Sequence, residues 1–519
     1  MNICTKSIRI ILLMSLLVVT MGSVCRKMRY PTREMRGLWV TRWEWAIGDS
    51  NKEEVQKRRI RDIFDQALNV KANVIFFQIR GNGDAFYVSK YEPWSELLSH
   101  KLGVDPGWDP LEFAINEAHK RGLELHVWFN TFPAWRGKTP PIHTRPEHVY
   151  NAHPEWLVCD KSGEPVKLSN HYVSLSPGIP AVRKYINDVA MDIVSKYDID
   201  GFHFDYIRYP EHADKLGYSH DSISVRLFKS RAGNPYNLDW DDWQRENINQ
   251  FVRMFYDNAT NLKPWVKVSA AVIGKYDYSA WNGYHVVYQD AMRWIKESKI
   301  DFIVPMIYWQ TDHKTAPFEK ITKDWLQNNV YERYIFPGLM INNLGSEKWP
   351  GEEVVKQIQI CRKYGNGMVF FSHGGLTRAI EAIQEKGDIL PANVPAMSWK
   401  DDKPPMDPRN LRAEFLADGT IKLMWDDSNS YNGPEDVVRF NVYRGEDRFI
   451  DYDDARDLLH ITSNLDNEYF DTTAKFGTQY FYAVTALDRV GNESPPSNIL
   501  EINIPLIAAS ENDRNTYLD

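Results

Sequence analysis

The chain has 519 residues, of which 43% are hydrophobic and 25% charged, as in ordinary globular proteins. This length exceeds one typical domain, so we expect two or more. The net charge of −8 gives no basic surface, which argues against nucleic acid as a partner.

Residues 1–25 have the pattern of a secretory signal. Basic residues precede an apolar run over residues 10–19, which is shorter than the roughly 20 residues of a membrane-spanning helix. Cys25 lies at the position of a lipoprotein cysteine, and ordinary signal cleavage nearby is the alternative. We therefore expect an exported protein of the periplasm or cell envelope. It is either anchored in the outer membrane through a lipid on Cys25 or carries no anchor.

Eight β-rich segments alternate with helical patterns between residues 33 and 390. This alternation predicts an α/β domain, and eight such units close a (β/α)8 TIM barrel. A doubly wound open sheet is the alternative, but no glycine-rich phosphate-binding turn follows the first strand. The expected strands are Arg36–Trp43, Asn73–Arg80, Leu123–Asn130, Gly201–Ile207, Val266–Ile273, Asp301–Trp309, Tyr334–Ile341 and Gly367–His373. The expected helices are Glu53–Val70, Pro110–Arg121, Ala181–Tyr197, Trp243–Leu262, Tyr288–Lys296, Phe318–Asn329, Glu352–Tyr364 and Thr377–Glu385.

Two connections are unusually long, over residues 131–180 and 211–242. Each follows the carboxyl end of an expected strand, which is the end where barrel enzymes hold their active sites. Loops of this length inside a compact domain are usually functional. We therefore expect both loops to shape a binding site.

The fourth expected strand carries the most informative carboxylate. Side chains alternate between the two faces of a strand, so Phe202 and Phe204 face the helices. His203 and Asp205 then face the barrel axis, where an unused, unpaired carboxylate would be costly. Asp205 is therefore the predicted nucleophile or transition-state-stabilising carboxylate. The alternative is that Asp205 and Arg208 form an ion pair that only braces the strand end.

Further polar and aromatic residues are expected at the strand ends. His126, Trp128 and Asn130 share the inward face of the third strand, and an imidazole, an indole and an amide together suit a sugar-binding site. The predicted substrate-binding set adds residues from the other strands: Arg36, Trp39, Gln78, Arg80, Asp84, His203, Arg208, Tyr308, Trp309 and His373.

Glycoside hydrolysis also needs a second carboxyl group that stays protonated as the general acid. Loop acids are available at Glu44, Asp84 and Asp312. We prefer Glu44 as the second catalytic residue, because it follows strand one and is flanked by Trp43 and Trp45. Their apolar surroundings would raise its pKa. The alternative for each carboxyl group is a solvated loop acid.

No cofactor and no metal site are expected. The 14 histidines are scattered without ligand spacing, and neither a P-loop nor a Gly-x-Ser-x-Gly turn occurs.

The composition changes after residue 390. A proline-rich linker is expected over residues 391–406, and a β-sandwich over residues 407–505. In its proline-rich entry, Trp425, the alternating strand around Tyr480–Ala486 and the exit Ser494–Ser497, this region resembles a fibronectin type III domain. A polar tail follows over residues 506–519. The clearest expected strands are Ile421–Trp425, Val437–Tyr443 and Gln479–Leu487.

Eight short motifs follow one another in the part of the chain that spans roughly residues 36–387. They are Met35–Trp39, Phe76–Arg80, Tyr87–Trp94, Gly107–Leu111, Glu117–Gly122, His126–Asn130, Asp200–Tyr206 and Pro305–Trp309. In these motifs the chain resembles the glycosyl hydrolase-like 10 family. The resemblance implies an exported bacterial barrel related to retaining glycosidases, in a family linked to cell-wall glycan cleavage. By position, Asp205 matches the acidic residue after the family's Gly-Phe-x-Phe pattern, whereas the segment Arg42–Trp45 departs from the common pattern.

The sequence thus predicts an exported glycoside hydrolase. Its substrate would be an O-glycosidic bond in a polysaccharide or in the glycan strand of peptidoglycan. One alternative is a non-catalytic carbohydrate-binding protein of the cell surface, and another is an adhesive protein in which the C-terminal domain dominates. A second carboxylate near Asp205 would favour the enzyme. The oligomeric state is left open.

Overall fold

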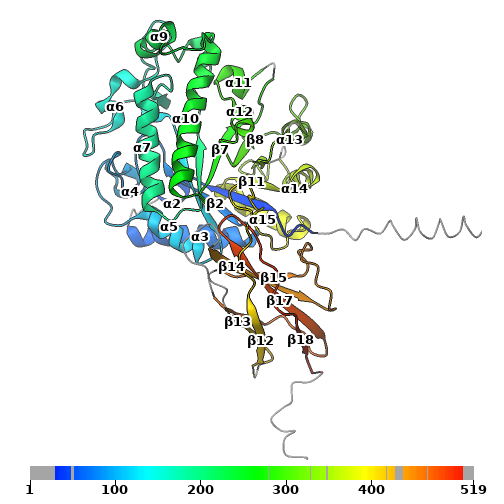
Figure 1. The fold of residues 1–519 in the computed structure, drawn as a ribbon. Coiled ribbons are helices and arrows are strands. Elements are labelled where there is room, and N and C mark those ends of the chain that lie inside the picture. Colours follow the sequence, from blue (N-terminus) through cyan, green and yellow to red (C-terminus); the bar gives the residue numbers. More distant parts are fainter. Residues whose placement is uncertain are drawn as a thin grey trace, which may run out of the picture.

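The computed structural model describes residues 30–47, 52–278, 280–327, 329–346, 349–416, 418–426, 436–463 and 466–505. The expected signal with Cys25 and the expected tail over residues 506–519 lie outside the described residues. The described chain forms a barrel surrounded by helices and a β-sandwich (Figure 1). In these ranges no helix is long and apolar enough to cross a membrane.

The barrel is a closed sheet in which every strand pairing is parallel. β9 and β10 together occupy the seventh strand position, and the pairing of β10 with β8 completes the ring. The predicted (β/α)8 barrel is confirmed, and the open sheet is excluded. Its strands are β1 (Met35–Val40), β2 (Val74–Arg80), β3 (Glu124–Asn130), β6 (Gly201–Asp205), β7 (Lys267–Ile273), β8 (Phe302–Met306), β9 (Tyr334–Ile335), β10 (Gly338–Met340) and β11 (Gly367–Phe371).

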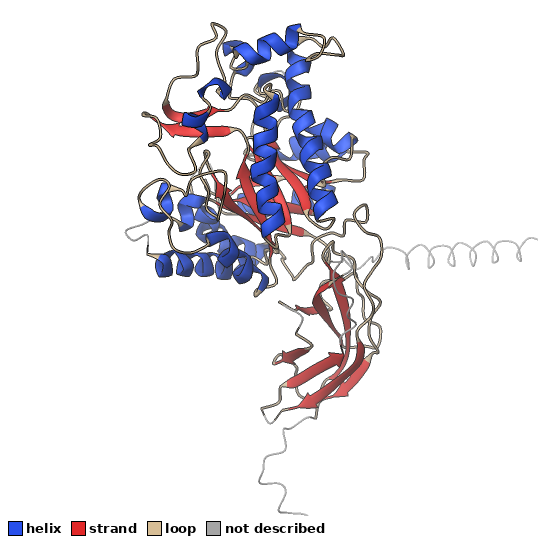
Figure 2. Ribbon diagram, turned by 60° about the vertical axis from the view of Figure 1, so that its left-hand side comes forward, coloured by secondary structure: helices blue, strands red, loops and turns tan. Residues whose placement is uncertain are grey.

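Helices surround the sheet (Figure 2). Most begin and end within a few residues of the expected bounds, and Asp109 caps α5 as expected by accepting hydrogen bonds from the N–H groups of Leu111 and Glu112. The helices of this layer are α3 (Glu53–Asn69), α5 (Pro110–His119), α7 (Pro180–Lys196), α10 (Trp240–Leu262), α12 (Ala291–Lys296), α13 (Phe318–Gln327), α14 (Glu352–Tyr364) and α15 (His373–Lys386).

The first strand ends earlier than expected. It stops at Val40, and the short helix α2 (Arg42–Trp45) begins after Thr41. The cause is a Thr-x-x-Glu capping box, in which the backbone N–H of Thr41 donates to Glu44 at 2.6 Å. Trp45 therefore stacks on Phe77 in the helix layer, with 5.0 Å between ring centroids, and does not face the barrel mouth.

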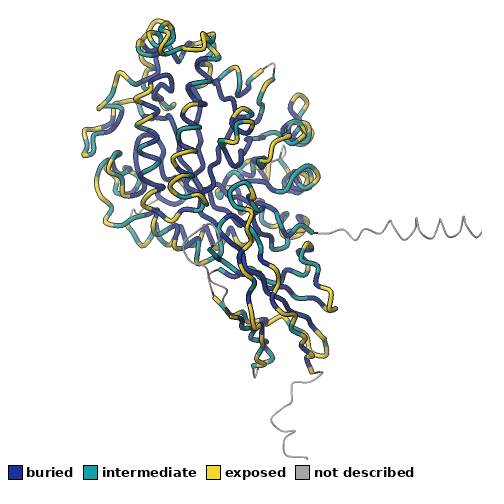
Figure 3. The backbone as a smooth tube through the Cα atoms, viewed as in Figure 1, coloured by how far each residue is buried: buried dark blue, intermediate teal, exposed yellow. Residues whose placement is uncertain are grey.

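The predicted alternation of side chains is confirmed on β6. Phe202 and Phe204 pack against Phe255 of α10, with ring centroids 4.8 and 4.7 Å away. His203 and Asp205 lie on the opposite face, toward the barrel interior, and all residues of β6 are buried. Figure 3 shows that the strands of the barrel are largely buried. The two inward side chains of β6 therefore lie at different heights in the barrel, with Asp205 nearer the carboxyl end of the strand than His203.

Insertions gather at the carboxyl ends of the strands, as the long connections predict. The connection after β3 forms an antiparallel ribbon of two strands, and the connection after β6 forms two short helices. Figures 1 and 2 show these insertions at the end of the barrel opposite the sandwich. They are α4 (Glu96–Ser99), β4 (Pro133–Gly137), α6 (Val149–Ala152), η1 (Pro154–Trp156), β5 (Ser169–Ser174), α8 (Ala213–Leu216), α9 (Ser222–Lys229) and α11 (Gly283–Val286).

The C-terminal domain is the predicted fibronectin type III-like sandwich. A sheet of order β12-β13-β16 faces one of order β15-β14-β17-β18, with Trp425 and Phe440 in the core between them. The strands are β12 (Arg409–Phe415), β13 (Ile421–Asp426), β14 (Val437–Gly445), β15 (Leu458–Ile461), β16 (Glu468–Asp471), β17 (Gln479–Asp488) and β18 (Leu500–Asn503).

The sandwich contacts the amino-terminal end of the barrel. Lys267 of β7 donates to Glu124 of β3 at 2.8 Å and to the backbone carbonyl of Arg489 at 3.1 Å. The proline-rich segment between the domains is packed, because Val394 and Met397 are buried with the barrel's inner core. The two domains therefore share buried contacts.

Candidate active site at the carboxyl end of the barrel

Asp205 is the last residue of β6, and its side chain lies at the barrel mouth. It is only 6% exposed. One carboxylate oxygen, Oδ1, accepts the backbone N–H of Tyr206 at 2.6 Å and lies 3.5 Å from Nη1 of Arg208. Its backbone carbonyl accepts from the N–H of Thr131, which ties the strand end to the start of the long loop after β3. The carboxylate is thus held in one position.

Tyr206 adopts a backbone conformation that is unusual for a side chain of its size. Its φ is 49°, in the left-handed region, where a non-glycine residue costs roughly 1–3 kcal/mol. This turn aims the Tyr206 N–H at Asp205, and the Arg208 guanidinium returns across the Tyr206 ring at 4.4 Å. Backbone strain of this kind clusters at functional sites.

Burial dominates the electrostatics of Asp205. Loss of hydration raises the pKa of Asp205, although the charge of Arg208 and the N–H groups of Tyr206 and Trp128 act in the opposite direction. Burial and the nearby Asp205 charge also raise the pKa of Tyr308 well above its usual value. The buried Tyr308 hydroxyl has no hydrogen-bond partner among the described residues. A buried carboxylate beside an unpartnered hydroxyl is expensive in a purely structural role.

Several predicted substrate-binding residues surround Asp205. Asn130 pairs with Asp205 in the register of β3 and β6, and Trp128 pairs with His203 one layer below. Gln78 donates to Asn130 at 3.2 Å, while Asn130 donates to the carbonyl of Gly81 at 3.0 Å. Tyr308 and Trp309 follow β8. The expected grouping of Gln78, Trp128, Asn130, Arg208, Tyr308 and Trp309 at the mouth therefore agrees with the structure, while their contact with a substrate stays a prediction.

Three predicted residues lie deeper than a substrate-binding role requires. His203 is fully buried, bonded at Nδ1 to Ser269 at 2.8 Å and at Nε2 to the indole N–H of Trp39 at 3.1 Å. Burial and the nearby His126 lower the pKa of His203 well below its usual value, so the ring is neutral. His126 lies one layer further down, 3.1 Å from Glu124. The inward direction was predicted, but Trp39, His126 and His203 fill the barrel interior below the mouth.

Three further residues of the predicted set brace the fold. Arg36 lies at the amino-terminal end of the barrel, where it bonds to Glu34 at 2.6 Å, because it starts its strand. Arg80 is fully buried, and its guanidinium pairs with Glu92 at 2.7 Å. His373 lies 3.1 Å from Gln66 of α3, because it begins α15 and turns toward the helix layer. The structure brings none of the three to Asp205.

The predicted general acids occupy different environments. Both oxygens of Glu44 are held, one by the Thr41 N–H and the other by the Ser372 hydroxyl at 2.6 Å and the Gly374 N–H at 2.5 Å. These bonds, and the burial of Trp45 away from it, remove the apolar pocket that favoured Glu44. Asp84 accepts from two backbone N–H groups of its own turn, and Asp312 is an exposed loop acid.

A carboxyl group overlooked in the sequence, that of the exposed residue Glu211, lies near Tyr206, the neighbour of Asp205. Glu211 lines a cavity of about 720 Å3 together with Tyr206 and Arg208. Its charge contributes to the raised pKa of Tyr206, about 12, after the larger contributions of burial and Asp205. Tyr172 of β5 lines the same cavity, with its ring 5.2 Å from that of Tyr206. Its position in the sequence could have indicated Glu211, because this residue directly follows the strand-end segment that contains Asp205.

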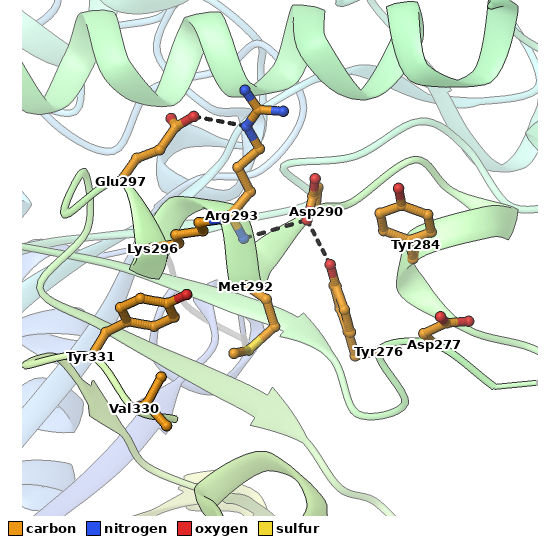
Figure 4. Close-up of a pocket in the computed structure, with 10 residues that line it drawn as sticks. All are labelled: Tyr276, Asp277, Tyr284, Asp290, Met292, Arg293, Lys296, Glu297, Val330 and Tyr331. Atoms are coloured by element: carbon orange, nitrogen blue, oxygen red, sulfur yellow. Dashed lines mark hydrogen bonds and ion pairs between the residues drawn. The ribbon is translucent and has the colours of Figure 1, made fainter. Parts of the chain in front are cut away.

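A second cavity, of about 640 Å3, lies away from this centre. Figure 4 shows Asp290 accepting from the hydroxyl of Tyr276 and from the backbone N–H of Arg293 in α12, while the guanidinium of Arg293 pairs with Glu297. These groups belong to the helix layer and to the loop after β7. No group of three or more His, Cys, Asp or Glu residues in the described ranges is arranged to hold a metal ion.

The chain is similar to several known proteins. A protein of Bacillus subtilis (strain 168) named "Glycosyl hydrolase YngK" is 30% identical over 529 residues, with 96% of this chain and 99% of that protein covered. "Glycosyl hydrolase DigH" of Escherichia coli (strain K12) is 29% identical over 326 residues, with 57% of this chain and 70% of that protein covered. The solved PgaB (BpsB) glycoside hydrolase domain from Bordetella bronchiseptica covers 69% of this chain and 99% of its own, at 12% identity and a TM-score of 0.49.

The family model described as Glycosyl hydrolase-like 10 matches residues 34–348, which include the barrel up to the loop after β10. The matched segment contains Asp205, Arg208 and Tyr308, so the mouth lies inside the family's common part. The predicted enzyme class, a glycosyl hydrolase, is confirmed at this level. The chain belongs to the glycosyl hydrolase-like 10 family.

Proposed function

We propose that this protein is an exported enzyme that hydrolyses O-glycosidic bonds in a polysaccharide or in the glycan strand of peptidoglycan. The observation that carries the proposal is the buried carboxylate of Asp205, held at the barrel mouth beside the unpartnered Tyr308 hydroxyl. The expected signal segment and the long loops around the mouth support an extracytoplasmic, polymeric substrate.

Asp205 would act on the anomeric carbon of the bound sugar. As a carboxylate, it either forms the new bond to this carbon or stabilises the positive charge that develops there. The Arg208 guanidinium and the Tyr206 N–H hold Oδ1 and favour the ionised form. Tyr308 would donate its free hydroxyl to an oxygen of the same sugar.

Glu211 is the proposed proton donor to the leaving oxygen. It lines the cavity that Tyr206 and Arg208 also line, whereas the hydrogen bonds of Glu44 hold both of its oxygens. In the first step the bond between the anomeric carbon and the leaving oxygen breaks, and its electron pair takes the proton of Glu211. Water then attacks the anomeric carbon and Glu211 takes its proton. Any bond between the anomeric carbon and Asp205 breaks in this step, and its electron pair returns to the carboxylate, so both groups are restored.

The proposal is tested by incubating the protein with defined glycans and identifying products by mass spectrometry. The set includes peptidoglycan strands with and without stem peptides, and uncharged polysaccharides. New reducing ends, each with one added water, are expected from at least one of these glycans. Specific binding without any product would favour a non-catalytic carbohydrate-binding protein instead.

A further inference from the structure

A small cavity lies beside the proposed reaction centre and is not used by the chemistry described above. Its volume is about 280 Å3, and its lining includes Arg42, Trp43, Asn82, Asp84 and Arg136. These residues follow β1 and β2 or belong to the β4–β5 ribbon, so the cavity opens at the barrel mouth.

Two contacts connect this cavity to the reaction centre. Nη2 of Arg42 donates to the hydroxyl of Tyr172 at 3.2 Å, and the Tyr172 ring lies 5.2 Å from the ring of Tyr206, the neighbour of Asp205. Arg136 lines both this cavity and the 720 Å3 cavity that contains Glu211. A chain of sugars could therefore occupy the two cavities at once.

Arg42 is a buried cation that pairs with no carboxylate in the part of the chain that the structure describes. It is 2% exposed, and its guanidinium donates only to Asn82 at 3.4 Å and Tyr172 at 3.2 Å among the described residues. Buried charges are normally paired, because the loss of hydration is costly. The Nε and Nη1 donors of Arg42 are unused in the described chain, and oxygen atoms of a ligand would satisfy them.

The surroundings of Arg42 are shaped to hold it. A Cβ at Gly81 would lie 2.4 Å from the guanidinium carbon, so only glycine allows Arg42 to lie against this turn. Trp43 is 44% exposed, and the guanidinium lies 4.6 Å from its ring centroid. Trp43 therefore keeps part of an apolar ring in solvent at the edge of a cavity lined with hydrogen-bonding groups.

We propose that this cavity is a sugar subsite for a unit of the glycan chain next to the one at Asp205. Trp43 stacks on the apolar face of that sugar, while Arg42 and Arg136 donate to its oxygens and Asp84 offers an acceptor. This inference rests on the proposed function, because it assigns the cavity to the same substrate chain. Binding then strengthens when the chain is long enough to reach Trp43.

The test measures binding separately from catalysis. Asp205→Asn protein is titrated with N-acetylglucosamine oligomers of increasing length by calorimetry, with and without the additional change Trp43→Ala. Trp43→Ala is expected to weaken binding of the longer oligomers about tenfold, which corresponds to ~1.4 kcal/mol, and to leave the shortest ones unchanged. Arg136→Ala should act in the same direction, and Trp43→Tyr should restore most of the affinity.

Tyr236→Ala, which removes a different exposed aromatic ring, is the matched control and should change nothing. Equal affinity of the Trp43→Ala protein for every length would overturn the subsite, and so would an equal loss at every length. Absence of oligomer binding to the Asp205→Asn protein would also overturn it. Activity of the unmodified protein is assayed separately, so a failure of the proposed hydrolysis is recognised on its own.

Discussion

The carboxylate of Asp205 and the guanidinium of Arg208 lie 3.5 Å apart, and both are largely buried at the end of β6. A charge-assisted hydrogen bond between such groups is usually ~2.7–2.9 Å long. The longer separation shows an ion pair that is not closed, and burial keeps the pKa of Asp205 raised despite it. This geometry favours a working carboxylate over a simple brace of the strand end.

The first prediction concerns stability and pH. Because burial raises the pKa of Asp205, the folded protein binds a proton there more tightly than the unfolded chain, whose Asp pKa is about 3.9. The wild type therefore loses stability, relative to Asp205→Asn, as pH rises from about 4 through the folded pKa. Urea unfolding of both proteins between about pH 4 and pH 8 checks this, and a difference that is constant across pH would contradict it.

The pH dependence of activity should also reflect the ionisation of Asp205. Asp205 must be ionised to act, so the raised pKa moves the acid limb of the kcat/KM profile above the range of an ordinary Asp. Rates measured across pH on one substrate give this limb. A limb at about pH 3.9 would show that burial does not control Asp205.

Replacing Glu211 and replacing Glu44 should have different effects, because only Glu211 is proposed as the general acid. Glu211→Gln should lower kcat about 10²–10⁴-fold on substrates with poor leaving groups, and far less on activated aryl glycosides, which need no proton. Glu44→Gln weakens a helix cap and should lower the melting temperature, with only a small effect on kcat. Kinetics on both substrate types compare the two variants. The reverse pattern would return the role to Glu44.

A stability prediction follows from the buried pair Arg80–Glu92, both side chains of which are fully buried. Arg80→Ala leaves a carboxylate buried without its partner, so the free energy of unfolding should fall by ~3–5 kcal/mol. The exposed pair Lys184–Asp188 serves as the control, and Lys184→Ala should have a much smaller effect, because water screens this pair. Denaturant titration measures both. Equal losses would mean that burial of the ion pair does not determine its contribution.

The barrel and the sandwich are expected to unfold together, because ion pairs and hydrogen bonds connect them. Lys267 connects the barrel to the backbone of Arg489, and Arg33 pairs with Glu493 of the sandwich at 2.6 Å. Calorimetry of the full chain should therefore show one cooperative transition. Two well-separated transitions would show that the domains are thermally independent.

Local alternation was enough to predict the barrel and the inward direction of Asp205, Trp128 and Asn130. Period-two patterning determines which face of a strand is buried, and the chain follows it on β3 and β6. The depth of each inward residue was not predictable in the same way. His203 and His126 face the axis as expected, but their rings bond to groups inside the barrel, His203 to Trp39 and Ser269 and His126 to Glu124.

Contacts between segments that are distant in the sequence could not be predicted either. Arg42 and Tyr172 are 130 positions apart, and only the folded loop after β3 brings them together. Arg80 pairs with Glu92, which lies in the loop after β2. Glu92 reaches the end of the strand only because of the conformation of that loop. In contrast, the Thr41 capping box was readable as Thr-x-x-Glu, and it would have shortened the first strand and given Glu44 a structural role.

The most direct test of the central claim is the rate of glycosidic bond hydrolysis by Asp205→Asn, compared with the wild type and with the exposed-acid control Asp312→Asn. Asn keeps the shape of the side chain but cannot carry the negative charge. We predict that Asp205→Asn lowers kcat/KM at least about 10³-fold while its far-UV spectrum stays unchanged, and that Asp312→Asn retains wild-type activity. Wild-type activity in Asp205→Asn would contradict the catalytic role of this carboxylate.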